Sequence, residues 1–248
     1  MNRLAVQAAS DHQWQKLIPT PPDNAMATAL VEQRVRSTLA APVASFLPLN
    51  YEPGYAYPLL VWLHDRGGSE RHLPQVMQHL STQNFVAVAP RGSHECNRVV
   101  KGHRWIQQPT AIAAADAAVS DAIQLARQEF NIHNERVFLI GHGDGGSMAL
   151  RLALQSPHRF AGAASINGRL PRRHGLLRSI NHIRSLPLFI ASSRDYEGYA
   201  ERAVCNDLRL LHSAGCSVSL RQYPGNDDLT TCMLADVNRW VMEHVCGN

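Results

Sequence analysis

The amino-acid sequence predicts an α/β fold with a mainly parallel central sheet and helices on both faces of the sheet. Short apolar runs recur along the chain, and they lack the alternating polar positions of a strand with one face in water. Segments of helical periodicity separate these runs, which is the order expected of βαβ units. The predicted strands are PLLVWLH (58–64), FVAVAP (85–90), RVFLIG (136–141), FAGAASIN (160–167), LPLFIAS (186–192) and SVSLRQY (217–223).

Three longer segments predict helices that cover the sheet. Residues 198–215 and 230–245 are amphipathic, and residues 111–131 show the clearest periodicity. A chain of 248 residues with this pattern can bury one large core without a second domain. The apolar residues of 111–131 follow the i, i+4, i+7, i+11 spacing of one buried helical face, and they are Val119, Ile123, Ala126 and Phe130.

The first part of the chain differs from the rest in composition. Residues 18–24 (IPTPPDN) predict a proline-rich linker, and residues 25–41 have the composition of a helix. We therefore expect an N-terminal extension over residues 1–44 and a single α/β domain over residues 45–248.

Composition and charge restrict the class of protein. Hydrophobic residues make up 45% of the chain and charged residues 18%, which is typical of a globular domain. The net charge of +4 is too small to indicate a nucleic-acid partner. No apolar stretch predicts a membrane span, and the N-terminus lacks the apolar region of a secretory signal. The five scattered cysteines predict reduced thiols in a cytoplasmic protein, with no metal site and no cofactor.

The segment VFLIGHGDGGSMAL (137–150) predicts a strand, a tight glycine turn and the start of a helix. In hydrolases this arrangement carries the serine nucleophile within G-x-S-x-G, and here Gly143 stands at the serine position. The letters GHGDGG also match the G-x-G-x-x-G loop that binds dinucleotides. That loop belongs after the first strand of its fold, whereas this turn follows two earlier strand–helix units.

Several segments, taken in order, resemble the phospholipase/carboxylesterase branch of the α/β-hydrolase superfamily, which includes acyl-protein thioesterase-like enzymes. PLLVWLHDRGGSE (58–70) resembles the strand and oxyanion loop of that branch. FNIHNERVFLIGHGDGGSMALRLALQSPHRFAGAASINGRLP (130–171) is similar to its nucleophile elbow, the next helix and the next strand. LPLFIASSRD (186–195) resembles the strand of the catalytic acid, and residues 211–241 resemble the last strand, the histidine loop and the last helix. The resemblance covers residues 45–245 and implies an α/β-hydrolase fold.

The resemblance also implies three catalytic positions, two of which carry an unsuitable residue. In this family a serine attacks the acyl carbonyl, a histidine takes its proton and an acid orients the histidine. Gly143 occupies the serine position and has no side chain with which to attack. Asp228 occupies the histidine position, and a carboxylate cannot replace imidazole as a base near neutral pH. Asp195 occupies the acid position, either in a vestigial role or as a solvated loop aspartate.

The implied oxyanion loop is altered as well. Its donors would be the backbone N–H groups of Arg66 and Asp144, and Asp65 stands where the family often has glycine. The Asp144 carboxylate would oppose the negative charge of the transition state. His64 and His142 are candidates for pocket lining or for structural histidines beside the turns, and no carboxylate spacing completes a metal site with them.

Two further segments bear on function. Asp144 is a candidate for a displaced nucleophile, but that register puts His142 where the elbow needs a small residue, and no histidine would activate water. Segment 169–184 predicts either a solvated surface or a contact with an anionic ligand or partner. It has no acidic residue and contains Arg169, Arg172, Arg173, Arg178 and Arg184.

The leading interpretation is a carboxylesterase/phospholipase-like protein without the serine nucleophile and the histidine base, impaired in catalysis or non-catalytic, that binds an ester-like small molecule or a protein partner. One alternative is an active hydrolase of carboxylic esters or thioesters that uses non-standard residues. The other is an interaction scaffold that uses the arginine-rich segment 169–184.

Overall fold

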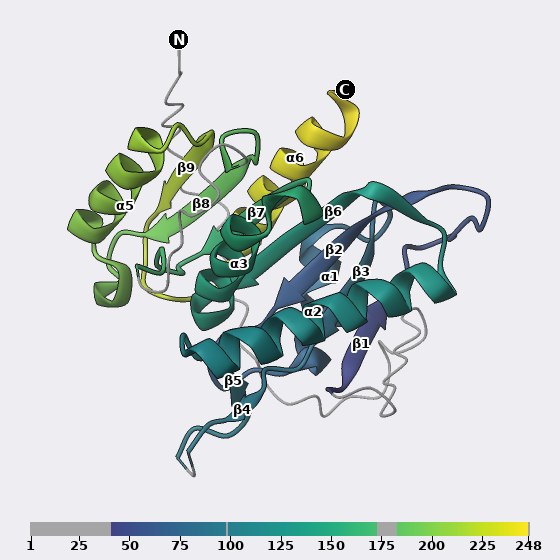
Figure 1. Cartoon of the computed structure of the whole chain (residues 1–248), viewed down its shortest axis with the longest axis horizontal. Coiled ribbons are helices and arrows are strands. Elements are labelled where there is room, and N and C mark those ends of the chain that lie inside the picture. The colour runs from purple at the N-terminus through teal and green to yellow at the C-terminus, as the bar shows by residue number, and fades with distance from the viewer. Residues whose placement is uncertain (1–40, 98, 173–182, 248) are drawn as a thin grey trace.

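The computed structural model describes residues 41–97, 99–172 and 183–247. The predicted linker at 18–24 and nearly all of the predicted helix at 25–41 lie outside these ranges. Seven of the described strands form one sheet in the order β1-β3-β2-β6-β7-β8-β9 (Figure 1). All neighbours are parallel except β1 and β3. The strands are β1 (Val43–Phe46), β2 (Tyr57–Leu63), β3 (Val86–Pro90), β6 (Ile132–His142), β7 (Gly162–Ile166), β8 (Leu188–Ser193) and β9 (Val218–Tyr223).

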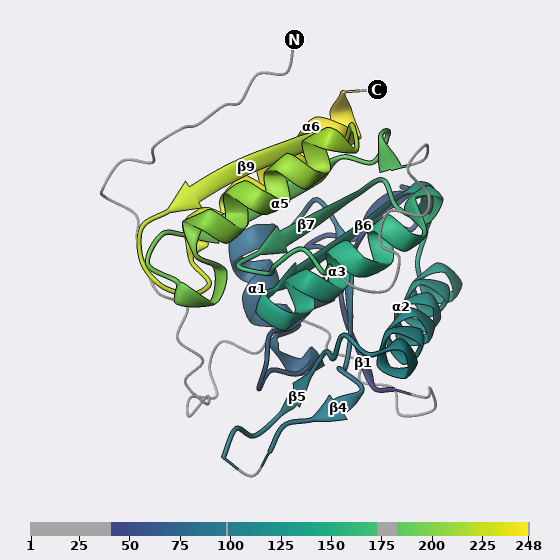
Figure 2. The same cartoon turned by 60° about the vertical axis from the view of Figure 1, so that its left-hand side comes forward.

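Helices cover both faces of this sheet, as the sequence predicted. On one face lie α1 (Leu73–Leu80) and α6 (Thr231–Cys246). The other face is covered by α2 (Pro109–Glu129), α3 (Gly143–Gln155) and α5 (Glu201–Ser213), which lie in front of the sheet in Figure 2.

The continuous apolar runs are explained by these two layers of helices. Leu59, Val61 and Leu63 of β2 belong to the core shared with α2 and α3, whereas Leu60 and Trp62 belong to the core shared with α1 and α6. Since successive side chains of a strand point to opposite faces, both faces of β2 must be apolar.

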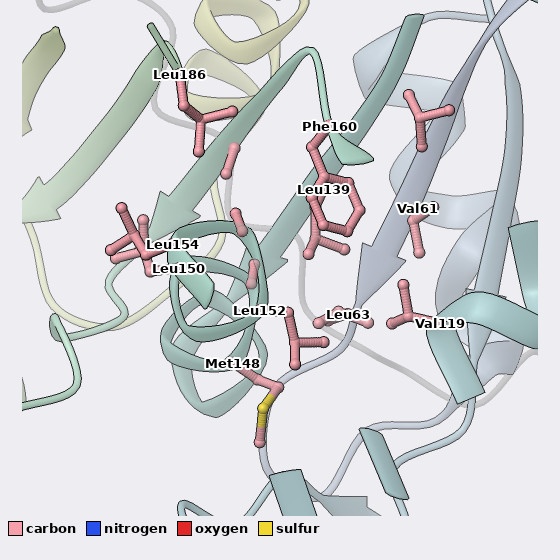
Figure 3. Close-up of a cluster of buried hydrophobic side chains, with 14 of the residues drawn as sticks. Val61, Leu63, Val119, Leu139, Met148, Leu150, Leu152, Leu154, Phe160 and Leu186 are labelled. Atoms are coloured by element: carbon pink, nitrogen blue, oxygen red, sulfur yellow. The ribbon is translucent and has the colours of Figure 1, made fainter. Parts of the chain in front are cut away.

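The predicted apolar face of the second helix is also present. Val119, Ile123 and Ala126 of α2 are buried, and Phe130 packs at the C-terminal end of the helix. Figure 3 shows Val119 near Leu63 within this core. The periodicity of this segment therefore predicted the correct buried face.

The register of the sheet gathers several loops at one edge. Leu63 of β2 pairs with Gly141 of β6, and Ile166 of β7 pairs with His142. The loops that follow β2, β6, β7, β8 and β9 leave from the carboxyl ends of parallel strands, where open α/β sheets bind their ligands.

Short elements complete the described residues. No described helix is both long and apolar enough to cross a membrane. All five cysteines lie in the described ranges, and none is disulfide-bonded. The short elements are a two-stranded ribbon of β4 (His94–Glu95) and β5 (His103–Arg104) and the 3₁₀ turns η1 (Glu70–His72), η2 (Pro157–Arg159) and η3 (Glu197–Tyr199).

Candidate functional site

β6 turns directly into α3 at residues 141–146, here called the elbow. Gly143, the first residue of α3, has a φ of +51°, a conformation that side chains disfavour. A β-carbon on Gly141 would lie 2.7 Å from an amide nitrogen in the first turn of α3. One on Gly145 would lie 2.6 Å from the carbonyl carbon of Leu63. The strand end and the helix start therefore approach so closely that these positions require glycine, as the sequence predicted.

The carboxylate of Asp65 fills the space in front of Gly143. A β-carbon on Gly143 would lie 2.6 Å from Oδ2 of Asp65, and closer still to Oδ1 and Cγ. Asp65 Oδ1 also accepts a hydrogen bond from the backbone N–H of Asp144 at 2.8 Å. The family resemblance implies this N–H as an oxyanion donor. In the described structure a side chain of the protein occupies that donor.

His64 holds the loop that carries Asp65. The imidazole is 1% exposed, and its Nδ1 lies 2.8 Å from the Asp65 carbonyl oxygen, while its Nε2 accepts from the N–H of Gly92 at 2.9 Å. The indole N–H of Trp105 donates to the His64 carbonyl at 3.0 Å. Burial lowers the pKa of His64 to about 4, so the ring is neutral at physiological pH. These contacts give His64 a structural role in the oxyanion loop.

His142 links the elbow to the loop after β9. Its Nε2 lies 2.8 Å from the carbonyl oxygen of Asp227, and its Nδ1 lies 3.9 Å from Oδ2 of Asp65. The first contact is a hydrogen bond in which Nε2 donates, whereas the second is too long to be one. His142 is therefore oriented by a backbone carbonyl and presents Nδ1 toward the Asp65 carboxylate.

Asp144 lies among charges of both signs. Its Oδ2 is 3.5 Å from a guanidinium nitrogen of Arg104 and 3.8 Å from Nε of Arg66. Burial raises the pKa of Asp144, and the neighbouring Asp65 carboxylate raises it further against the effect of the two arginines. The guanidinium groups of Arg104 and Arg66 therefore partly balance the charge of Asp144.

Asp195 and Asp228 lie in the loops where the family's acid and base are expected. The exposed Asp195 accepts from the N–H of Gly225 at 3.0 Å through Oδ2, and its own N–H donates to the Gly225 carbonyl at 3.0 Å. Asp228 lies in the loop after β9, three residues beyond Gly225. The nearest histidines in sequence lie in helices instead, His212 in α5 and His244 in α6. Within the described residues, no imidazole forms a hydrogen bond with Asp195.

Two cavities flank Asp65. The elbow cavity, of about 590 Å³, is lined by Gly143, Ser147, Asn167, Arg169 and Tyr196 beside the aspartates. The second cavity, of about 490 Å³, lies toward α1 and is lined by His64, His142 and Asp228 together with Trp62, Val76 and Leu229. Asp65, Arg66 and Asp227 line both cavities.

Sequence reasoning missed Tyr196 and Asn167, which line the elbow cavity. Tyr196 directly follows the predicted acid Asp195, and burial raises its pKa, with further contributions from the Asp65, Asp227 and Asp144 carboxylates. Asn167 has a φ of +55° and exchanges hydrogen bonds with Ser193 at 2.8 and 3.1 Å. The asparagine–glycine pair of residues 167 and 168, at the end of the predicted strand 160–167, was the available signal for a turn at residue 167.

The arginine-rich segment is described only at its ends. Arg172 donates at 2.5 Å to Asp207, which is 2% exposed, and Arg169 donates to the carbonyl of Gly198. Arg184 lies 3.4 Å from the Ala214 carbonyl. These arginines have partners within the fold, while residues 173–182 lie outside the described ranges.

Within the described ranges, no group of three or more histidine, cysteine, aspartate or glutamate side chains is arranged to hold a metal ion. The absence of a cofactor and the cytoplasmic location stay predictions.

The fold and the elbow define an α/β-hydrolase, and comparison with known proteins places the chain within that superfamily. Residues 55–193 match the phospholipase/carboxylesterase family, so the chain belongs to this family. The chain is 29% identical over 136 residues to a protein of Nocardia uniformis subsp. tsuyamanensis described as "Putative esterase NocK". The matched region is 53% of this chain and 39% of that protein, so the match spans about two fifths of the relative's length.

Solved structures support the same fold. A carboxylesterase from Mesorhizobium loti superposes with a TM-score of 0.70 at 20% identity, over 85% of this chain and 98% of that one. A carboxylesterase from Bacillus cereus gives 0.68 at 16% identity, over 84% and 96%. SOBER1 from Arabidopsis thaliana gives 0.65 at 20% identity, over 77% and 100%. The predicted α/β-hydrolase fold is therefore confirmed.

Proposed function

We propose that this chain has lost the acyl-transfer chemistry of its family and is a ligand- or partner-binding protein on a hydrolase fold. The observation that supports this most directly is the elbow. Gly143 has the positive φ and the position of a nucleophile but no side chain, and a carboxylate from another loop fills the space in front of it. In a triad enzyme, loss of the nucleophile alone costs on the order of 10⁶ in turnover.

The general base of the family's triad is also missing. A serine hydroxyl needs an imidazole within hydrogen-bond reach, and the position implied for it holds Asp228. His142 is part of the elbow, but its Nε2 donates a hydrogen bond to the Asp227 carbonyl. One of the two implied oxyanion donors, the Asp144 N–H, is bound to Asp65. Nucleophile, base and oxyanion site are therefore all compromised.

Labelling with a fluorophosphonate probe tests this proposal. The purified full-length chain should show no stoichiometric labelling, and it should not hydrolyse short-chain p-nitrophenyl esters or thioesters above the rate of a heat-denatured sample. An active serine esterase run in parallel shows that the probe and the substrates are sound. Heat-sensitive labelling that maps to a serine would overturn the proposal.

The same assay tests the alternative that this chain is an active hydrolase with non-standard catalytic residues. Ester turnover without serine labelling, abolished in Asp144→Asn, would establish that alternative and contradict the loss of acyl transfer. Gly143→Ser provides a further check, since this variant should remain inactive for lack of a base.

A further inference from the structure

The elbow site has lost a hydrogen-bond donor and gained an acceptor. In a serine hydrolase, the N–H of the residue after the nucleophile donates to the carbonyl oxygen of the substrate. Here the corresponding N–H of Asp144 donates to Asp65 Oδ1 at 2.8 Å. An incoming carbonyl or carboxylate oxygen would therefore meet a negatively charged oxygen where it needs a donor.

The second oxygen of Asp65, Oδ2, has no hydrogen-bond partner among the described residues. Nδ1 of His142 approaches Oδ2 only to 3.9 Å, which exceeds hydrogen-bond length. The Asp65 side chain is 34% exposed and lines the elbow cavity of about 590 Å³. Oδ2 can therefore accept a hydrogen bond from a molecule that enters this cavity.

Each arginine that lines the cavity lies near an acceptor of the protein. Nε of Arg66 forms a 3.8 Å ion pair with Asp144 Oδ2, and Arg169 donates to the Gly198 carbonyl. The carboxylates around the cavity also affect Tyr196. Burial raises the pKa of its hydroxyl, and the negative charges of the neighbouring carboxylates raise it further. Tyr196 therefore stays protonated.

We propose that Asp65 determines the ligand specificity of the elbow cavity: its carboxylate takes the place of a ligand's carboxyl group, excludes esters and carboxylates, and selects ligands that donate a hydrogen bond to Oδ2. This inference rests on the proposed function. A cavity that catalysed acyl transfer would have to bind the carbonyl oxygen of an ester, whereas the ligand proposed here donates a hydrogen bond to Asp65. Among donors, a primary ammonium group is the best match, since it brings a positive charge to the carboxylate. Specificity of this kind arises as much from repulsion of the wrong ligand as from attraction of the right one.

Asp65→Asn offers a sharp test because the amide has nearly the same shape. Its Oδ1 can still accept from the Asp144 N–H, while the second terminal atom, Oδ2 in wild type, changes from an acceptor to a donor. The experiment measures binding of benzylamine and benzoate to the full chain by ligand-observed NMR. Wild type should prefer benzylamine, and Asp65→Asn should weaken benzylamine about tenfold and prefer benzoate.

Two further variants complete the test. Asp65→Gly, which frees the Asp144 N–H and serves if the asparagine variant fails to fold, should also gain benzoate binding. Glu135→Gln makes the same change of charge at an exposed position near the start of β6 and should leave both ligands unaffected. Equal or stronger benzoate binding by wild type, no benzylamine binding by wild type, or an unchanged preference in folded Asp65 variants would overturn the inference. Serine labelling would instead contradict only the proposed loss of acyl transfer.

Discussion

Gly143 and Asp65 occupy one space that can hold only one side chain. A β-carbon on Gly143 would lie 2.6 Å from Asp65 Oδ2, and nearer to the other carboxylate atoms. The two residues are 78 positions apart, but the pairing of Leu63 with Gly141 brings the ends of β2 and β6 together. The absence of a side chain at residue 143 and the carboxylate at residue 65 are therefore parts of a single arrangement.

The first prediction concerns the stability of Gly143→Ser. Serine at a φ of +51° brings backbone strain of roughly 1–3 kcal/mol, and overlap with the Asp65 carboxylate adds to this. For a domain of this size each kcal/mol lowers the melting temperature by about 2–4 °C, which calorimetry can measure. In the Asp65→Gly background the overlap disappears, so the loss should be smaller. Equal losses in both backgrounds would show that residues 143 and 65 do not compete for space.

The second prediction concerns restoration of esterase activity. Gly143→Ser with Asp228→His supplies a nucleophile and a base, but Asp65 would still occupy the oxyanion donor. We expect this pair to remain inactive toward p-nitrophenyl acetate, and we expect measurable turnover only when Asp65→Gly is added. Gly143→Ser with Asp65→Gly, which lacks the base, is the matched control. Turnover by the pair alone would mean that Asp65 moves aside when substrate binds.

The third prediction is a loss of stability in mild acid through His64. Burial lowers the pKa of His64 in the folded chain to about 4 from its ordinary value of 6.5, so the unfolded chain binds more protons between these pH values. The contribution of neutral His64 to the free energy of unfolding is therefore complete above pH 6.5. It is lost as the pH falls toward 4, by roughly 3 kcal/mol over the whole window. Urea unfolding at several pH values should show a shallower pH dependence for His64→Gln than for wild type. Exposed His158 is the control, and His158→Gln should keep the wild-type slope. An unchanged slope in His64→Gln would be evidence of another proton-binding group.

The fourth prediction concerns the ion pair of Glu70 and Arg91. Glu70 is fully buried and accepts from Nε and a terminal nitrogen of Arg91 at 2.7 and 2.5 Å. Burial alone would raise the pKa of Glu70, but the hydrogen bonds from Arg91, a backbone hydrogen bond and the charges of Arg91 and Arg71 together lower the pKa. Glu70→Gln should destabilise the fold by roughly 3 kcal/mol, because the partly buried guanidinium loses its counter-charge.

Chemical denaturation measures this effect against two controls. Glu70→Gln with Arg91→Met should recover part of the loss, since no charge is then left unpaired. Arg239, an exposed partner of Asp236 at 3.1 Å, serves as a surface control, and Arg239→Met should change the unfolding free energy by less than about 1 kcal/mol. A Glu70→Gln variant as stable as Arg239→Met would mean that water replaces the buried pair without cost.

The sequence was most informative where the relevant pattern is local. The run 58–64 predicted β2 because both faces of that strand are apolar, and the glycines of 141–146 predicted the elbow because close backbone approach excludes side chains. Such patterns depend on residues a few positions apart. They were sufficient for the α/β-hydrolase fold and for the location of Gly143.

The chemistry at the elbow could not be predicted in the same way. Nothing near Asp65 in the sequence indicates that its carboxylate reaches the N–H of Asp144, since this depends on the register of β2 against β6. Equally, the contact of His142 with Asp227 depends on the path of the loop after β9. Side-chain direction across two loops is a tertiary property, and it decided which donors and acceptors remain open.

The shared space at residues 65 and 143 also has a historical consequence. A chain with serine at 143 could not have accepted the present Asp65 conformation, because the serine β-carbon would overlap that carboxylate. Glycine at 143, in contrast, is compatible with either a small residue or aspartate at 65. If the chain descends from a serine enzyme, the present conformation of Asp65 therefore arose after the loss of the nucleophile, or in the same step. Relatives with Asp at the position of residue 65 should then carry glycine at the elbow, and a relative with both Asp and serine should hold its aspartate in a different rotamer.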